Sequence, residues 1–143
     1  MRRFVILLAC IGAAALGGCS MDVHTLKPTP GVMHEIGLPL YPHSTTRYAM
    51  RVSQGIQGHH IDSLIATLET RDDLDTVDRF YQKHLPNYAQ RVAIPLGPVR
   101  TIQYTFYSAL GQEQVQLQHI QAVTVIRLQL LRLTSPSPSP AAS

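Results

Sequence analysis

The 143-residue chain lacks any apolar run long enough to cross a membrane. Its longest such run, from Phe4 to Leu16, has 13 residues, whereas a membrane-spanning helix needs about 20. The run follows Arg2 and Arg3 and ends in small residues. A basic start, an apolar middle and a small-residue end are typical of a secretory signal, so the sequence predicts a cleaved signal over residues 1–18.

Clusters of basic charge are also missing. No run of five or more Lys or Arg occurs, and aromatic and basic residues do not alternate, so nucleic acid is not an expected partner. Removing Arg2 and Arg3 with the signal from 12 Lys and Arg residues leaves 10 against 9 Asp and Glu, a net charge near +1. The formal charge of +3 therefore belongs partly to the signal.

Motifs of known catalytic or metal chemistry are absent as well. The chain has no G-x-S-x-G turn and no H-E-x-x-H pair, and the acidic run Asp72–Asp78 lacks the glycine and the final glutamate of a calcium loop. We therefore predict a non-catalytic protein without a cofactor, and expect the acidic run to be a solvated helix face. Apart from His59 and His60, the histidines are interpreted as scattered surface residues, with His119 on a strand face: His24, His34, His43, His84 and His119.

One stretch keeps an alternative open. Ser53, His59, His60 and Asp62 bring together residue types used in hydrolysis and metal binding. His59 and His60 are neighbours, so on a strand they would point to opposite faces, and closeness in sequence does not create the geometry of a catalytic triad. The alternative function is a periplasmic metal-binding protein or hydrolase that uses His59, His60 and Asp62.

The predicted signal ends at Gly18 within the run Leu16-Gly17-Gly18-Cys19-Ser20. This run resembles the lipobox of bacterial lipoproteins, which are cleaved just before the lipobox cysteine. The resemblance therefore implies cleavage between Gly18 and Cys19. The resemblance implies a diacylglycerol on the Cys19 sulfur and a further acyl chain, such as palmitate, on its new amino group; two or more chains anchor a protein stably. Aspartate after the cysteine retains family members at the inner membrane. Ser20 therefore implies the outer membrane, with the domain facing the periplasm.

Cysteine is scarce in this chain. Cys10 lies within the signal, and Cys19 takes the lipid on this interpretation. The exported domain then has no thiol and no disulfide, although the periplasm permits disulfides. A catalytic cysteine and a cysteine-ligated zinc site are both excluded.

The rest of the chain divides into three parts. Residues 19–38 carry the lipid and are rich in proline and glycine, so we predict a flexible tether there. Residues 39–133 are long enough for one small domain. Residues 134–143 repeat Ser-Pro and offer nothing large to bury, so we predict a disordered tail.

Periodicity indicates the fold of residues 39–133. One apolar face, acidic first turns and Pro86 predict a helix over Asp72–Leu85, with Thr70 and Asp73 as a capping box. Alternating apolar residues predict strands around it, with Gly111 in a hairpin turn, Pro95–Pro98 as a loop, and the most apolar strand over Val123–Leu133. The predicted class is α+β: an antiparallel sheet with one main helix packed on one face.

The start of this domain, Pro39-Leu40-Tyr41-Pro42, resembles the opening segment of many small bacterial envelope lipoproteins of uncharacterised function. In them a helix with a Phe-Tyr pair follows, as Phe80-Tyr81 does here. The expected function is that of a membrane-anchored binding or envelope-assembly module. Its expected partners are the membrane, through lipid on Cys19, and another envelope protein.

Overall fold

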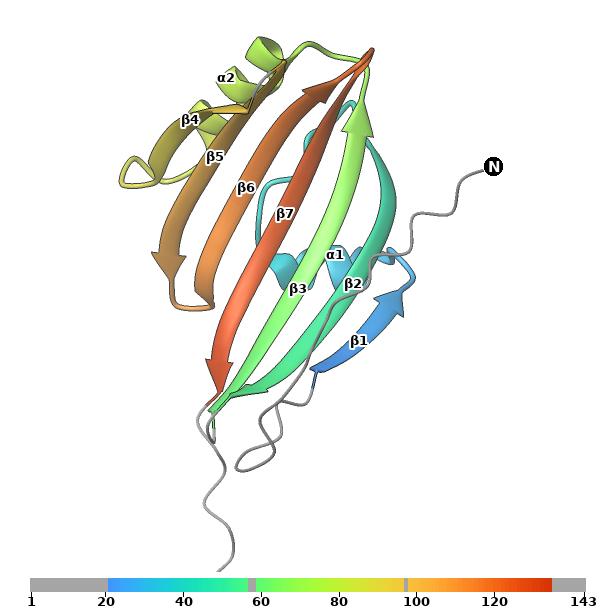
Figure 1. Cartoon of the computed structure of the whole chain (residues 1–143), viewed down its shortest axis with the longest axis vertical. Coiled ribbons are helices and arrows are strands. Elements are labelled where there is room, and N and C mark those ends of the chain that lie inside the picture. Colours follow the sequence, from blue (N-terminus) through green and yellow to red (C-terminus); the bar gives the residue numbers. More distant parts are fainter. Residues whose placement is uncertain (1–20, 57–58, 97, 135–143) are drawn as a thin grey trace, which may run out of the picture.

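Seven strands form one antiparallel sheet in the computed structural model, which describes residues 21–56, 59–96 and 98–134. The spatial order is β1-β2-β3-β7-β6-β5-β4 (Figure 1). The strands are β1 (Met21–Leu26), β2 (Thr45–Ile56), β3 (His59–Thr70), β4 (Gln90–Leu96), β5 (Val99–Ser108), β6 (Gly111–Ile120) and β7 (Val123–Thr134). The helices are α1 (Pro30–Ile36), between β1 and β2, and α2 (Leu74–His84), between β3 and β4. The α+β class and the antiparallel sheet are confirmed.

The sheet consists of two meanders joined at its centre. One meander is β1-β2-β3, and the other runs backwards across the sheet as β7-β6-β5-β4. They meet where β3 pairs with β7 along its length, for example Ile65 with Gln129 and Leu68 with Ile126. The last described strand, β7, therefore lies in the middle and is paired on both sides.

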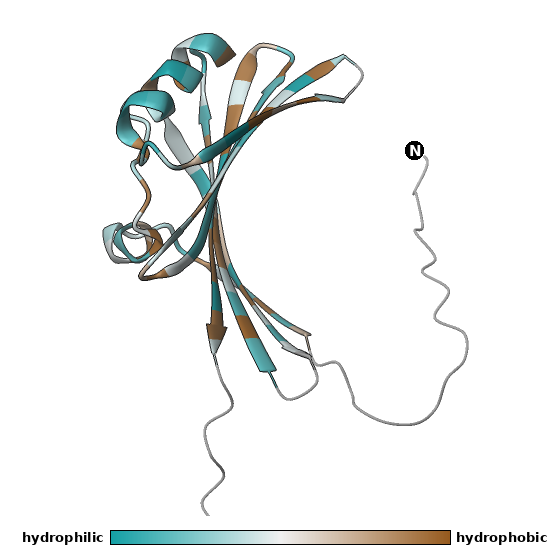
Figure 2. Cartoon of the chain, turned by 90° about the vertical axis from the view of Figure 1, so that its left-hand side faces the viewer, coloured by the Kyte–Doolittle hydropathy of each residue, from teal (hydrophilic) through white to brown (hydrophobic). Residues whose placement is uncertain are grey.

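Both helices pack on the same face of the sheet (Figure 2). The inward side chains of the strands alternate as predicted, with Leu64, Ala66 and Leu68 of β3 buried. We call the opposite face the open face, because no described helix lies on it. The remaining core residues of the central strands are Ile102, Tyr104, Phe106, Val115, Leu117, Ile126, Leu128 and Leu130.

Helix α2 begins two residues later than predicted. Asp73 is its N-cap and accepts a hydrogen bond from the backbone N–H of Thr76 at 2.8 Å. The capping role thus belongs to Asp73 alone, since the Thr70 hydroxyl instead accepts from the N–H of Asp72. Asp75 in the first turn suits the helix dipole, and Leu85 caps the other end.

The prediction of a flexible tether over residues 20–38 is wrong for its described part. Strand β1 and helix α1 occupy most of it, and Met33 and Ile36 of α1 are buried in the core. The same residues that suggested a tether build the helix ends. Thr29 is the N-cap, Pro30 sits in the first turn where a missing N–H costs nothing, and Gly37 closes the helix with φ of 73°. The described domain begins at Met21, not at Pro39.

The turns β5–β6 and β4–β5 differ in their exact residues from the predicted loops. The β5–β6 hairpin turns at residues 109–110, and Gly111 opens β6 with φ of 140°. A Cβ on Gly111 would collide with the carbonyl oxygen of Leu131 on β7, so glycine is needed there for close approach. The predicted loop Pro95–Pro98 is shorter than expected, because Pro95 still pairs with Arg100. Gly97 lies outside the described residues.

Candidate binding surface

The residues of the predicted lipid site, Gly18, Cys19 and Ser20, lie outside the described residues, as do the signal over residues 1–18 and the Ser/Pro tail from Ser135. Thr134, which the prediction assigned to the tail, ends β7. Across the described ranges, no helix is long and apolar enough to cross a membrane.

The residues of the alternative function are only partly brought together. Asp62 lies opposite Ser53 in the β2–β3 register, on the face that carries the helices. The Ser53 hydroxyl donates directly to the Asp62 carboxylate at 2.6 Å, with no imidazole between them. His60 shares that face, whereas His59 lies on the open face, as expected for neighbours on a strand. Within the described ranges, no three His, Cys, Asp or Glu side chains are placed to hold a metal ion.

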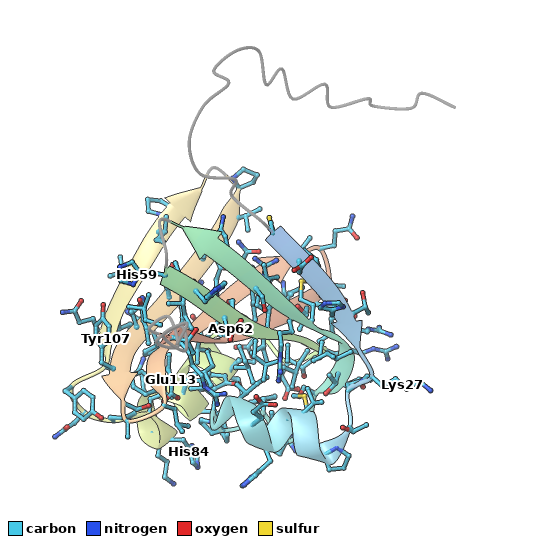
Figure 3. All side chains as sticks on the ribbon, turned by 90° about the horizontal axis from the view of Figure 1, so that it is seen from below. Lys27, His59, Asp62, His84, Tyr107 and Glu113 are labelled. Carbon is cyan, nitrogen blue, oxygen red and sulfur yellow. The ribbon has the colours of Figure 1, made fainter. Side chains whose placement is uncertain are left out.

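The other histidines are dispersed over the molecule. His84 contacts the backbone oxygen of Phe80 at 2.8 Å, and His119 contacts the Thr124 hydroxyl at 3.1 Å. Figure 3 labels His59 and His84, which lie on different elements, β3 and α2. The interpretation of these residues as scattered is consistent with their separate local partners.

The acidic run at the start of α2 does not form a joint site, because each carboxylate has its own partner. Asp73 caps the helix, and Asp75 pairs with Arg100 at 3.1 Å on the surface. Asp72 accepts from the Tyr41 hydroxyl at 2.5 Å and contacts His43 at 3.1 Å. The hydrogen bond from Tyr41, followed by that from His43, lowers the pKa of Asp72. Burial, with the bond to Asp72, raises the pKa of Tyr41 to about 12.

Asp78 is the buried member of this run and joins three elements. Arg91 of β4 donates to both carboxylate oxygens, at 3.1 and 2.7 Å, and Gln82 donates at 2.9 Å. The Tyr104 hydroxyl of β5 also donates to it. Burial alone raises the pKa of Asp78, but the hydrogen bonds from Arg91 and Tyr104 outweigh burial, and the net pKa is lowered. The carboxylate therefore stays charged and links α2 to the sheet.

A second ionic cluster links α1 to the sheet. Glu35 accepts from Arg51 of β2 through both carboxylate oxygens at 2.8 Å, and from Arg132 of β7 at 3.2 Å. Every charged group in this cluster has a partner of opposite sign. Its arrangement fixes the helix and offers no free nucleophile or base.

Most aromatic side chains of α2 and β5 belong to the core. Tyr81, Tyr104 and Phe106 are buried, and Phe80 packs edge-on against Tyr41 at 5.2 Å between ring centroids. Tyr107 is the exception, with 71% of its surface exposed on the open face.

A layer of glutamines covers one half of the open face. Strands β5, β6 and β7 each place amides there, and hydroxyls of neighbouring residues accept hydrogen bonds from several of them. Gln129 donates to Ser63 at 2.8 Å and Gln118 donates to Thr101 at 3.3 Å. We call this set the glutamine layer: Gln103, Gln112, Gln114, Gln116, Gln118 and Gln129.

The glutamine layer is a polar surface with little charge. Arg127 of β7 lies opposite Gln116 and is the one charged side chain that the described register places among these amides. Amides keep further donors and acceptors available for a ligand. The layer can therefore bind a polar partner through hydrogen bonds, with a single cation in its middle.

The other half of the open face is apolar at one end. Register places side chains of β1, β2, β3 and β7 next to one another there, with Met21 opposite Gln54 and Ile61 opposite Leu133. We call this set the apolar end: Met21, Val23, Val52, Ile61, Leu131 and Leu133. A patch of this kind on an exposed sheet face is typical of an interaction site.

Neither the glutamine layer nor the apolar end was predicted, because only the apolar residues of each alternating pattern, which face the core, were used to identify strands. Gln114, Gln116 and Gln118 alternate with Val115 and Leu117. The repeated glutamine on the outer side was itself a signal of an unusual polar face. Antiparallel sheets often leave one face in water, and its residues then reveal what that face can bind.

Comparisons with known proteins found no match to this chain among family models, curated proteins or solved structures.

Proposed function

We propose that this protein is a lipid-anchored lipoprotein of the outer membrane whose periplasm-facing domain binds another envelope component without catalysing a reaction. The observation that carries the anchor is the run Leu16-Gly17-Gly18-Cys19-Ser20. The binding role is supported by the glutamine layer, an extended polar surface that no described helix lies over. The paired clusters around Asp78 and Glu35 account for the charged side chains near the helices as structural links.

The anchor is tested by changing Cys19 to Ala. The variant should accumulate as an unprocessed precursor and lose labelling by a palmitate analogue, because the thiol that accepts the lipid is gone. Changing Cys10 to Ala is the matched control and should leave both processing and labelling intact. Normal processing of the Cys19→Ala chain to a soluble product would contradict the proposal.

The binding surface is tested by crosslinking in cells. A photoreactive amino acid at Gln116, in the middle of the glutamine layer, should capture an envelope component that mass spectrometry then identifies. The same group at Arg79, on the exposed side of α2, is the control and should give little product. Equal crosslinking from both positions would contradict a role for the open face.

The alternative is a metal-binding protein or hydrolase using His59, His60 and Asp62. Metal analysis of the protein purified without a histidine tag separates it from the proposal. Stoichiometric zinc or copper that is lost when His59 and His60 are changed to Ala would favour the alternative.

A further inference from the structure

The first described strand lies very close to the proposed lipid. Cys19 precedes Met21 by two residues, and two residues of extended chain reach at most about 7 Å. A long tether would let the domain turn freely above the membrane, whereas this short link restricts which end of the sheet can approach it. The inference that follows rests on the proposed lipid anchor.

The end of the sheet next to that link is the apolar end. Met21 starts β1, and the same end carries the close of β7 (Figure 1). Three of its side chains are well exposed: Met21 by 61%, Val23 by 54% and Leu133 by 74%. Moving exposed apolar side chains from water into the lipid interface lowers the free energy.

Apart from the titratable His59 at the start of β3, charged side chains on the open face begin only further along the sheet. Side chains that lie opposite one another on neighbouring strands form rows across the open face. In the described register, neither the row that contains Leu133 nor the row that contains Leu131 holds a charged group. Arg127 and Glu69 are the first charges towards the other end of this face. The charged residues near the apolar end lie on the helix side of the sheet instead: Asp22, Asp62 and Arg132. The open face can therefore meet a bilayer here without burying a carboxylate, a lysine or an arginine, which would be expensive.

We propose that the apolar end lies against the bilayer that holds the anchor. Lipid on Cys19 supplies the main attachment, and the exposed side chains of Met21, Val23 and Leu133 enter the headgroup boundary. The sheet then stands with the β6–β7 turn pointing away from the membrane. Gln112, which pairs with Leu131, lies at the edge of this contact, and the rest of the glutamine layer stays in water, where it is accessible to a partner.

The test uses the full mature, lipidated chain in vesicles of phosphatidylethanolamine and phosphatidylglycerol. An environment-sensitive fluorophore is attached at Leu133→Cys, and separately at Ile120→Cys. Ile120 is a matched control because it is apolar, 41% exposed and on the same face. It pairs with Val123 at the other end of β7, about 33 Å from Leu133 at a strand rise of about 3.3 Å per residue. The label at position 133 should show blue-shifted emission and several-fold stronger quenching by headgroup-linked quenchers than the label at position 120.

A second pair of variants tests the contact itself. Val23→Asp should reduce quenching of the label at position 133, because it places a charge in the contact. Val92→Asp should not, although Val92 is also an exposed valine of an edge strand on the open face. Equal, water-like emission from both labels on vesicle-bound protein would overturn the inference while leaving the anchor intact.

Two further outcomes are decisive. Failure of the chain to take up palmitate or to float with vesicles would overturn the anchor and this inference together. A blue shift at position 133 that grows with protein concentration in the absence of vesicles would overturn the inference in favour of pairing between two copies.

Discussion

At the scale of single residues, the structure distinguishes between acidic groups that share a short stretch of sequence. Asp75 and Asp78 are three positions apart on α2, yet Asp75 is exposed and Asp78 is buried. The difference follows from helix geometry, because the side chain at 78 points with Leu74 and Val77 towards the sheet. The prediction of a solvated face for the whole run is wrong for Asp78. Its partner Arg91, thirteen positions away, gave no local signal of the pairing.

Changing Asp78 to Asn should destabilise the domain by about 2 kcal/mol, because it removes charge-assisted hydrogen bonds from Arg91 and Tyr104. Arg91 remains partly in water, which limits the loss. Urea unfolding of the mature chain measures the effect. The control is Asp75→Asn, whose exposed pair with Arg100 should contribute at most about 1 kcal/mol. Equal losses in the two variants would contradict the structural role of Asp78.

At the scale of elements, alternation and the α2 pattern identified strands of the sheet and α2, whereas β1 and α1 were missed. Regular alternation around Leu64, Ile102 and Val115 identified strands because those residues face a continuous core. The segment before Pro39 shows no sustained apolar period, and its prolines and glycines suggested a break. Thr29-Pro30 followed by Gly37 was nevertheless a start and a stop signal for a short helix.

Replacing Ile36 with Ala should destabilise the domain by about 2–4 kcal/mol, because the Ile36 side chain of α1 is fully buried in the core. A flexible tether would show no such loss. His34→Ala on the exposed side of the same helix is the control and should change the unfolding free energy by less than about 0.5 kcal/mol. Thermal and urea unfolding followed by circular dichroism provide the measurement.

Truncation separates the last strand from the residues that follow it. A chain ending at Thr134 should keep its melting temperature within about two degrees, because the Ser-Pro tail offers nothing large to bury. A chain ending at Val123 should fail to fold, since it loses Ile126, Leu128 and Leu130 from the core at roughly 2–5 kcal/mol each. Equal tolerance of the two truncations would contradict the central position of β7.

At the scale of the whole molecule, the sequence predicted the class of fold and could not predict its strand order. Alternation shows that a segment is a strand, but says nothing about which strand lies beside it. The pairing of β3 with β7 joins residues such as Ile65 and Gln129 that are far apart in the chain. The alternating glutamines of β6 could have been noticed in the sequence, but the extent of the glutamine layer could not, because it depends on β5, β6 and β7 lying side by side.

The domain should lose stability in acid. The pKa values of Asp72, Asp73 and Asp78 are all lowered in the folded state. A carboxyl group with a lowered folded pKa contributes stability that is present above its unfolded pKa of about 3.9 and is lost as the pH falls through the folded value. Urea unfolding between pH 7 and pH 2 should show this decline below about pH 4. The Asp78→Asn variant should decline less steeply; an identical slope would contradict the assignment to Asp78.

The central position of β7 also determines the order in which parts of the sheet can form during folding. A chain that emerges from its N-terminus first can form the β1-β2-β3 meander, and later β4-β5-β6, before β7 exists to join them. Until then β3 and β6 each present an unpaired edge that can pair with another chain. Closure also requires contacts between distant parts of the sequence, which form slowly. Refolding should therefore be limited by the docking of β7, and a nascent chain is most prone to aggregate just before its final strand arrives.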